Sequence, residues 1–137
     1  MEAASADLAG THVWCPLPDS LITGVETITV DSASVIGSGN ANTDAMIVGG
    51  CTSGAANSAR AYGTATAPAG SWFLPSLAEL NQLYMQKDVV GGFAAAVDYW
   101  SSSQQRDTHA WFQFFDDGSQ SNGFKSNSNP VRPVRAF

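Results

Sequence analysis

A helix start signal at Ser76 is the feature that most constrains the fold of this chain. Ser76 and Glu79 form a capping box, in which the serine hydroxyl accepts a hydrogen bond from the backbone of residue 79 and the glutamate reaches back to the Ser76 amide. The pattern predicts a helix over about 77–87 that ends before the glycines at 91 and 92. Apolar residues recur along it at helical spacing and form one stripe: Leu77, Leu80, Leu83 and Tyr84.

After Asp98 the sequence changes to a β pattern. Aromatic residues and serines predict strands over 99–103 and 110–115, and Asp117-Gly118 directly behind the second run predicts a hairpin turn. Residues 120–129 are interpreted as a polar arm. Residues 131–137 alternate as a closing strand, in which Pro133 indicates an edge position or a bulge.

The N-terminal half carries weaker signals. Residues 1–11 are mostly small and are predicted to fray, whereas residues 22–30 alternate well enough for one or two strands. Residues 36–40 have the composition of a turn. Asn42 or Thr43 is predicted to cap a helix that lies between Thr43 and Tyr62, and glycines at 49, 50 and 54 predict that this helix is irregular or interrupted.

Composition limits the classes of partner. A chain of 137 residues fits one domain with one hydrophobic core, and only 13% of its residues are charged. The net charge of −6 argues against nucleic acid, because binding to phosphates needs clustered cations that release counterions. No window is apolar enough for membrane insertion, and Met1–Ser5 lacks the basic start of a signal peptide, so none is predicted in this chain.

The two cysteines, Cys15 and Cys51, leave the redox state open. They are predicted either to form one disulfide or to lie as two free buried thiols. Two cysteines need histidines to complete a tetrahedral zinc site, and the sequence has only His12 and His109, so such a site is not expected. No metal ligands and no cofactor are assigned.

The run 111–115 carries aromatic residues on both faces of its predicted strand. Trp111 and Phe115 share one face with Gln113, while Phe112 and Phe114 lie on the other. One face has to be core. The other face is either covered as well or forms an apolar patch that suits a ligand or a neighbouring subunit.

Two further pairs of residues carry structural predictions. Trp72 and Trp100 alternate with other apolar residues and are predicted to pack in the core. Arg132 and Arg135 have different parity on the closing strand, so they point to opposite faces. One of the two arginines is expected to pair with a buried carboxylate and the other to face solvent.

Three blocks of the sequence, in this order and spacing, carry a family resemblance. They are Ile36–Thr43; Trp72–Ser76, continuing through Glu79–Asn81 to Leu83–Tyr84; and a C-terminal set of Tyr99–Ser103, Ala110–Trp111, Asp117–Gly118 and Val131–Phe137. Together they resemble the C-terminal domain of collagen-like bacterial adhesins and its phage relatives. The chain is also similar to the variable proteins that retroelements diversify, in which a comparable C-terminal stretch displays the ligand-binding surface.

The resemblance implies a C-type-lectin-like fold of the formylglycine-generating-enzyme kind, an α+β fold with two helices packed on twisted antiparallel sheets. It covers residues 35–137, and residues 1–34 either complete this domain or dock onto a neighbour. It further implies a glycan or surface-protein receptor as partner, a homo-oligomer (a trimer or a higher assembly), and a place outside the cell, on a cell surface or virion.

Departures from the family patterns narrow the chemistry. The calcium-dependent sugar motifs of animal lectins are absent, and no cysteine follows Cys51, whereas the related oxidase needs a pair of cysteines near its C-terminus. Ser101–Ser103 lacks the glycine pattern of a hydrolase elbow, and His109 has no nucleophile at a defined spacing. The chain is therefore predicted not to be an enzyme and to have no catalytic residues, and an oxidase-like activity is the weakest alternative.

Two polar stretches, 104–108 and 119–129, flank the aromatic strand and are predicted to converge on one surface. Their amides and hydroxyls suit sugar hydroxyls or a protein epitope. The alternatives are two solvated loops without a ligand, and a decoration or filament subunit whose aromatic strand is buried between chains. The predicted ligand-binding residues are Gln104, Gln105, Arg106, Asp107, Trp111, Gln113, Phe115, Gln120, Asn122, Lys125 and Asn127.

Overall fold

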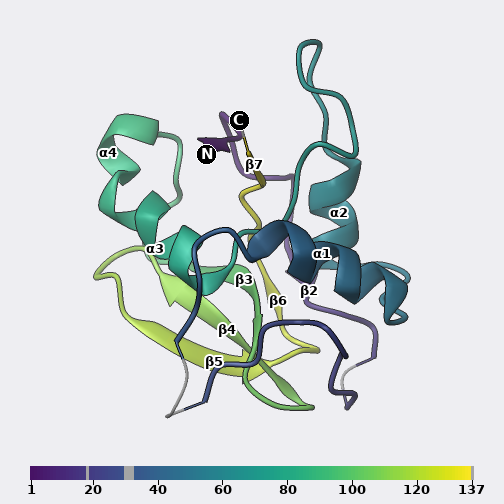
Figure 1. Cartoon of the computed structure of the whole chain (residues 1–137). Coiled ribbons are helices and arrows are strands. Elements are labelled where there is room, and N and C mark those ends of the chain that lie inside the picture. Colours follow the sequence, from purple (N-terminus) through teal and green to yellow (C-terminus); the bar gives the residue numbers. More distant parts are fainter. Residues whose placement is uncertain (18, 30–32, 137) are drawn as a thin grey trace.

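The largest sheet of the protein is antiparallel and three-stranded, with the order β3-β4-β5 (Figure 1). The computed structural model describes residues 1–17, 19–29 and 33–136. In chain order its elements are β1 (Glu2–Ala3), β2 (His12–Val13), α1 (Gly39–Val48), α2 (Ala55–Ala61), α3 (Leu77–Met85), α4 (Lys87–Val90), β3 (Asp98–Gln104), β4 (His109–Phe114), β5 (Gln120–Phe124), β6 (Ser128–Asn129) and β7 (Val134–Arg135).

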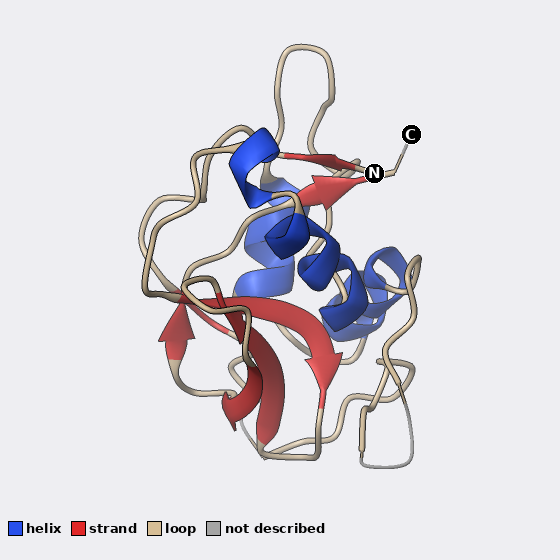
Figure 2. Cartoon of the chain, turned by 90° about the vertical axis from the view of Figure 1, so that its left-hand side faces the viewer, coloured by secondary structure: helices blue, strands red, loops and turns tan. Residues whose placement is uncertain are grey.

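The fold belongs to the α+β class, as predicted. The part of the chain that the structure describes has four helices and small antiparallel sheets, where two helices were expected. α1 and α3 contact the large sheet, while α2 contacts α1 and β2. Figure 2 shows the three-stranded sheet on one side of the helices and the β1–β7 pair on the other.

β3 is buried because a different hydrophobic core lies against each of its faces. Trp100 packs in one core with Trp14 and residues of α1 and α2. Tyr99, its neighbour, points the other way and packs with Leu80 and Phe115 in a second core. Successive side chains of a strand point to opposite faces, so one strand serves both cores. The prediction that Trp100 is a core residue is confirmed.

α3 follows its prediction. The Ser76 hydroxyl accepts a hydrogen bond from the Glu79 amide at 3.2 Å, and the Glu79 carboxylate accepts one from the Ser76 amide at 3.4 Å, which confirms the capping box. Leu77, Leu80 and Leu83 are buried. The helix ends at Met85, and α4 continues the chain to the two glycines.

The first helical region is interrupted, as predicted, but it begins earlier than expected. α1 starts at Gly39, inside the segment predicted to be a turn. Asn42 and Thr43 are not caps; they are buried within the helix, because their side chains find partners in other segments. The Asn42 Oδ1 atom accepts from the Glu26 amide at 2.9 Å, and the Thr43 hydroxyl accepts from the Leu74 amide at 3.0 Å.

The prediction that residues 1–11 fray is wrong. β1 pairs antiparallel with β7, and the Ala4 amide donates to the carbonyl of Pro133 at 2.9 Å. Ala4 packs against Trp72, which is buried as predicted. Small residues suit this position because they lie between the closing strand and a tryptophan ring, which the sequence of the leader alone does not show.

The two arginines of the C-terminal segment hold this arrangement in place. Arg132 is buried, and its Nε donates to the Asp7 carboxylate at 2.7 Å, so the expected ion pair is confirmed. The other oxygen of Asp7 accepts from the Tyr99 hydroxyl at 2.7 Å, and burial together with this carboxylate raises the pKa of Tyr99. Arg135, which was expected to face solvent, is instead half-buried and pairs with Glu2 at 2.6 Å.

The strand predicted over residues 22–30 does not form within 22–29, and residue 30 lies outside the described residues. Only Thr27 makes a β-bridge, to Gln104. Ile22, Val25 and Ile28 are buried, and the backbone of this segment bonds to Gln104 at the end of β3 instead of forming a ladder along its length. The backbone N–H of Gln104 donates to the Glu26 carbonyl at 2.9 Å, and the backbone carbonyl of Gln104 accepts from the Ile28 N–H at 2.8 Å. The side-chain amide of Gln104 accepts from the Ile22 N–H at 3.1 Å and donates to the Ile22 carbonyl at 2.8 Å.

The interpretation of residues 120–129 as a polar arm is wrong in part, because this segment contains two strands, β5 and β6. β5 pairs with β4 along its length, and β6 pairs with β2. A strand at the edge of a sheet needs no apolar alternation, so its polar sequence did not reveal it. The turn between β4 and β5 lies at residues 115–118, as predicted from Asp117-Gly118, whereas the regular part of the closing strand is short.

Cys15 and Cys51 form a disulfide, which decides between the alternatives that the sequence left open. Both cysteines are buried in the core that contains Trp14. The bond joins the segment after β2 to the connection between α1 and α2. It therefore attaches the N-terminal segment to the helices.

Candidate functional site

Four predicted site residues lie in the interior. Gln104, Gln113, Phe115 and Lys125 are each at most 2% exposed, so their side chains do not form part of an accessible surface. This corrects the prediction that the whole set lies on one surface. The prediction failed for these four residues because the polar composition of a segment does not show which of its side chains point into the interior.

Lys125 shows this most clearly. Its Nζ donates to the Ser20 carbonyl at 2.8 Å and to the Gln104 Oε1 atom at 3.0 Å, and it lies 4.7 Å from the centre of the Trp14 ring. These groups are neutral, and burial disfavours the charged ammonium, so the pKa of Lys125 falls to about 8. The lysine connects the end of β5 to the N-terminal segment.

Gln113 and Phe115 are covered by α3. The Gln113 Nε2 donates to the Asn81 side chain at 2.8 Å and to the Gly118 carbonyl at 2.9 Å. Phe115 lies in the second core, with its ring centroid 4.5 Å from that of Tyr99. These contacts fix the hairpin against the helix and keep both side chains buried.

The other predicted residues remain on the surface, and the pairing of β4 with β5 brings the two polar stretches together. Trp111 is opposite Asn122, and His109 is opposite Phe124. Residues directly opposite each other in an antiparallel pair share one face of the sheet. We call this face the hairpin surface; it consists of His109, Trp111, Gln120, Asn122 and Phe124.

Gln105, Arg106 and Asp107 lie in the connection between β3 and β4, next to one end of the hairpin surface, and Asn127 lies in the turn after β5. The Lys125 amide donates to the Thr108 carbonyl at 2.9 Å, which holds this connection beside the end of β5. The expected convergence of the two stretches is therefore present for their exposed residues.

Phe124 was missed in the sequence, although it is the most exposed aromatic residue described, at 55%. Its ring lies 4.4 Å from the imidazole of His109, centroid to centroid. The signal that could have identified it is parity: positions 120, 122 and 124 share one face of a strand. That signal has meaning only once the polar arm is recognised as a strand.

His109 is oriented by its neighbours. Its Nδ1 atom lies 2.7 Å from the Thr108 hydroxyl and 3.1 Å from the Nε of Arg106. Burial and the Arg106 charge lower the pKa of His109, so the imidazole is neutral at neutral pH. This neutral ring is tilted by 43° against the ring of Phe124, and together the two rings form a weakly polar part of the surface.

Trp111 and Gln120 line an open hollow of about 330 Å³ beside α3. The indole N–H of Trp111 donates to the Ile28 carbonyl at 3.1 Å, which fixes the ring. Leu77, Ala78 and Asn81 of α3 also line this hollow. The ring is half-buried, so the face of the strand that carries it is partly covered and partly open.

The ends of the hairpin surface carry acidic residues. Asp116 and Asp117 are exposed in the turn before β5, and Asp107 is exposed at the opposite end. Asp117 accepts a hydrogen bond from the Ser119 amide at 2.9 Å, which lowers the pKa of its carboxyl group. Arg106 is exposed next to Asp107 in the chain, and its Nε donates to the Nδ1 atom of His109.

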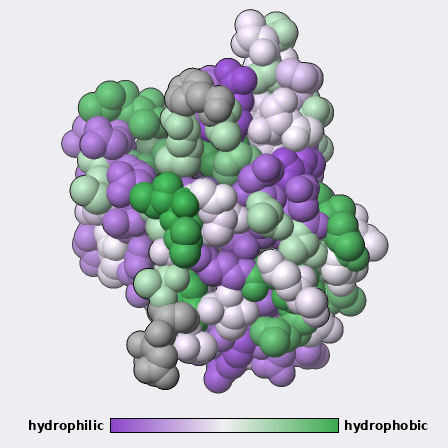
Figure 3. Space-filling view, in the orientation of Figure 1, coloured by the Kyte–Doolittle hydropathy of each residue, from purple (hydrophilic) through white to green (hydrophobic). Residues whose placement is uncertain are grey.

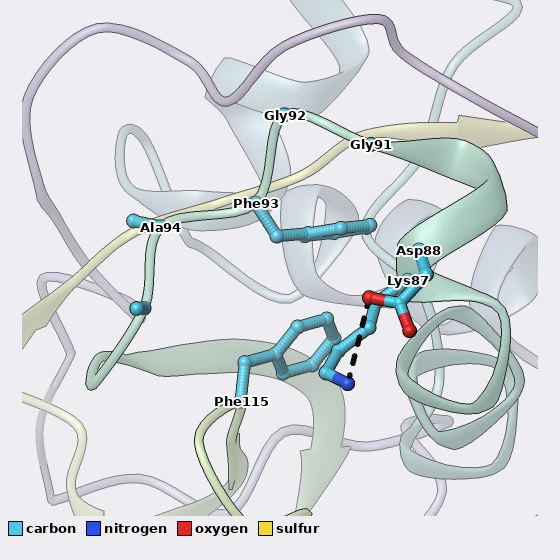
Figure 4. Close-up of a pocket in the computed structure, with 8 residues that line it drawn as sticks. Lys87, Asp88, Gly91, Gly92, Phe93, Ala94 and Phe115 are labelled. Atoms are coloured by element: carbon cyan, nitrogen blue, oxygen red, sulfur yellow. Dashed lines mark ion pairs between the residues drawn. The ribbon is translucent and has the colours of Figure 1, made fainter.

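A second hollow, of about 310 Å³, lies away from the hairpin surface between α4 and the segment 91–95 (Figure 4). The rings of Phe93 and Phe115 line it, and so do Lys87 and Asp88, whose Nζ and Oδ1 atoms lie 3.8 Å apart. These two charges compensate each other, so the hollow has no net charge to select an ionic ligand.

Within the described residues, no group of three or more His, Cys, Asp or Glu side chains could hold a metal ion. No helix of the same part of the chain is long and apolar enough to cross a bilayer. No protein-family model matches the chain, and no curated protein matches its sequence.

Proposed function

We propose that this chain is a non-enzymatic ligand-recognition domain with a C-type-lectin-like fold, which binds a glycan or a cell-surface protein through the hairpin surface. The observation that carries the proposal is the juxtaposition of two accessible aromatic rings, Trp111 and Phe124, with two amide side chains, Gln120 and Asn122. The α+β fold and the three sequence blocks support it.

The chemistry of these side chains suits such ligands. An aromatic ring offers a flat apolar surface for the C–H face of a sugar or for an apolar side chain. The neighbouring amides each offer donors and an acceptor, which match hydroxyl groups or a peptide backbone. The neutral imidazole of His109 adds to the platform without adding charge.

The disulfide supports a place of action in an oxidising compartment, outside the cell, on a cell surface or on a virion. Disulfides of this kind persist in extracellular and virion proteins and are rare in a reducing cytosol. A homo-oligomer, a trimer or a higher assembly, would multiply weak contacts with a repeated ligand.

The test uses substitutions that leave the core intact. We expect Phe124→Ala and Asn122→Ala each to lower binding to a glycan array or to displayed surface proteins by about tenfold or more, a loss of roughly 1.4 kcal/mol. Gln86→Ala, which alters an exposed residue at the end of α3, is the matched control. Substituting Gln113 or Lys125 would test folding instead, because both are buried.

Equal binding by the wild type and the Phe124→Ala variant would place the ligand elsewhere. Absence of any ligand on both arrays, with the fold intact, would argue against a recognition domain.

A second candidate function is that of a structural subunit. Apolar side chains are exposed over α4 and over the segment that leads into α1 (Figure 3): Val89 is 84% exposed, Ile36 is 62% and Val35 is 60%. Such residues are often covered in assemblies. Light scattering across a dilution series would favour this function if a large assembly persists without ligand and Ile36→Ser disperses it.

A further inference from the structure

β5 is the edge strand of the large sheet. One edge of β5 pairs with β4, and within the described residues no strand pairs with its other edge. Edge strands present unpaired backbone groups that can bind another chain. The orientation of the backbone groups of β5 therefore decides what this edge can accept.

The hydrogen bonds at both ends of the β4–β5 pair fix that orientation. The Phe114 amide donates to the Ser119 carbonyl at 2.8 Å, and the Lys125 amide donates to the Thr108 carbonyl at 2.9 Å. Because bonded and non-bonded pairs alternate in an antiparallel ladder, Ser121 and Gly123 also face β4. Gln120, Asn122 and Phe124 then point their backbone groups away from the sheet.

These outward groups are available. In the described part of the chain, no other segment bonds to the backbone of Gln120 or Asn122, whereas the Phe124 carbonyl already accepts from the Asn127 amide at 2.9 Å. The edge therefore offers the N–H groups of three alternate residues and the carbonyls of two of them. This spacing matches an extended peptide backbone, since such a chain presents its own groups at every second residue.

The edge also lacks the features by which natural sheets prevent pairing. Such features are proline, charged side chains and bulges. β5 has no proline and no charged residue, and the lysine that follows it turns into the core. Gly123 and the exposed Phe124 leave the edge open and partly apolar.

The charges around the edge select the occupant. Asp116 and Asp117 are exposed at one end of β5, Asp107 lies beside the exposed Arg106 at the other end, and the whole chain carries a charge of −6. A second copy would bring the same negative charge to the edge, whereas a basic segment is attracted to it.

We infer that the outer edge of β5 is a docking strand for an extended basic peptide segment of a partner protein, which adds a fourth strand to the sheet. The contact uses the backbone of β5, so it goes beyond the proposed function and does not depend on a ligand at the hairpin surface.

The probe is an acetylated and amidated octapeptide of alternating Lys and Val, added to the intact disulfide-bonded chain. Hydrogen exchange followed by NMR reports each amide of β5. We expect the amides of Gln120, Asn122 and Phe124 to exchange about tenfold more slowly with saturating peptide, because each gains a partner. The amides of Ser121 and Gly123 face β4 and serve as the internal reference.

Asn122→Pro and Asn122→Ala separate backbone from side chain. Proline removes an outward N–H without removing a bond to β4, so the variant should fold and lose peptide binding by about tenfold or more, while Asn122→Ala keeps it. If the proline variant fails to fold, N-methylation of alternate peptide amides makes the same test on the unaltered protein. Methylation of one edge of the peptide should abolish binding.

Several results would overturn the inference. They are unchanged exchange with peptide, equal binding by Asn122→Pro, and equal binding of an octapeptide of alternating Glu and Val. Slow exchange of the three amides without peptide, together with a doubled mass, would also overturn it, since a second copy would then occupy the edge.

Discussion

At the scale of single residues, the protein buries a lysine in its interior, a position that apolar residues usually occupy. Lys125 is fully buried and contacts a tryptophan ring, a carbonyl and a glutamine oxygen, with no carboxylate in contact. Burial of an ammonium group with no carboxylate in contact is unfavourable. It favours the neutral amine over the charged form, and the pKa of Lys125 is lowered for this reason. Sequence alone could not reveal this, because a lysine in a polar stretch is almost always exposed.

The stability of the protein should therefore rise between pH 8 and about pH 9.5. The pKa of Lys125 is about 8 in the folded chain and 10.5 in its ordinary state, so the unfolded chain binds more protons in this range, and the free energy of unfolding increases with pH. We expect a gain of about 1 to 2 kcal/mol, measured by urea unfolding.

Lys125→Met keeps the length of the side chain and removes its charge, so its stability should stay flat across the same range. Parallel pH curves for the two proteins would show that the lysine keeps its ordinary pKa.

At the scale of elements, α1 and α3 meet at one carboxylate. Glu79 accepts from the amides of Gly37 at 3.0 Å and Gly39 at 3.2 Å, in addition to closing the capping box of its own helix. The partial positive charges at helix N-termini favour an anion there. The first two blocks of the family resemblance thus touch each other: one supplies the amides and the other supplies the carboxylate.

Gly39→Ala should disrupt this junction. A Cβ atom at this position would collide with Glu79 Oε1 and would lie 2.8 Å from the Ser76 nitrogen and 2.9 Å from the Leu74 carbonyl oxygen, which are backbone atoms and cannot move away easily. We expect a loss of about 1 to 3 kcal/mol in the free energy of unfolding. Ala41→Ser, at an exposed position of the same helix, should change it by less than about 0.5 kcal/mol. Equal stability of the two variants would contradict the tight junction.

The elements differ in how far sequence could predict them. α3, β3, β4 and the turn that follows β4 have strong local signals, namely a capping box, aromatic runs and Asp-Gly, and they form close to where they were predicted. β1 and β5 do not, because their pairing depends on partners far away in the chain or on an edge position that needs no apolar residues. Residues 22–29 alternate like a strand, but their backbone bonds to both the backbone and the side chain of Gln104 at the end of β3, and no ladder forms along the segment.

The candidate site, too, could be predicted from the sequence only in part. The sequence located the hairpin turn but not β5, and the structure keeps Trp111, Gln120 and Asn122 on the surface of the hairpin. It did not separate these residues from Gln104, Gln113 and the other inward side chains, because their burial is decided by α3 and by the N-terminal segment.

At the scale of the whole molecule, the N-terminal segment is tied to the rest at several points. β1 pairs with β7, Asp7 pairs with Arg132, and Cys15 is bonded to Cys51. Ser20 and Ile28 then support Lys125 and Trp111 below the hairpin surface. The candidate site is consequently built on the N-terminal segment as well as on the C-terminal strands.

Removal of the disulfide should lower stability without changing the fold. The bond closes a loop with a sequence separation of 36 residues, so a Cys15→Ala/Cys51→Ala variant is expected to lose about 3 to 4 kcal/mol in the free energy of unfolding, through the greater freedom of its unfolded chain. Urea unfolding of the variant, and of the wild type with and without reductant, measures the loss. Wild type that is equally stable with and without reductant would contradict it.

The pairing of β1 with β7 also gives the molecule a practical property. It brings the two ends of the chain together on the side of the helices away from the large sheet (Figures 1 and 2). A short linker could therefore join residue 136 to Met1, and new ends could be opened in the exposed connection at residues 64–66. Such a circular permutant, or the domain inserted into a loop of a carrier protein, would present the hairpin outward from its scaffold.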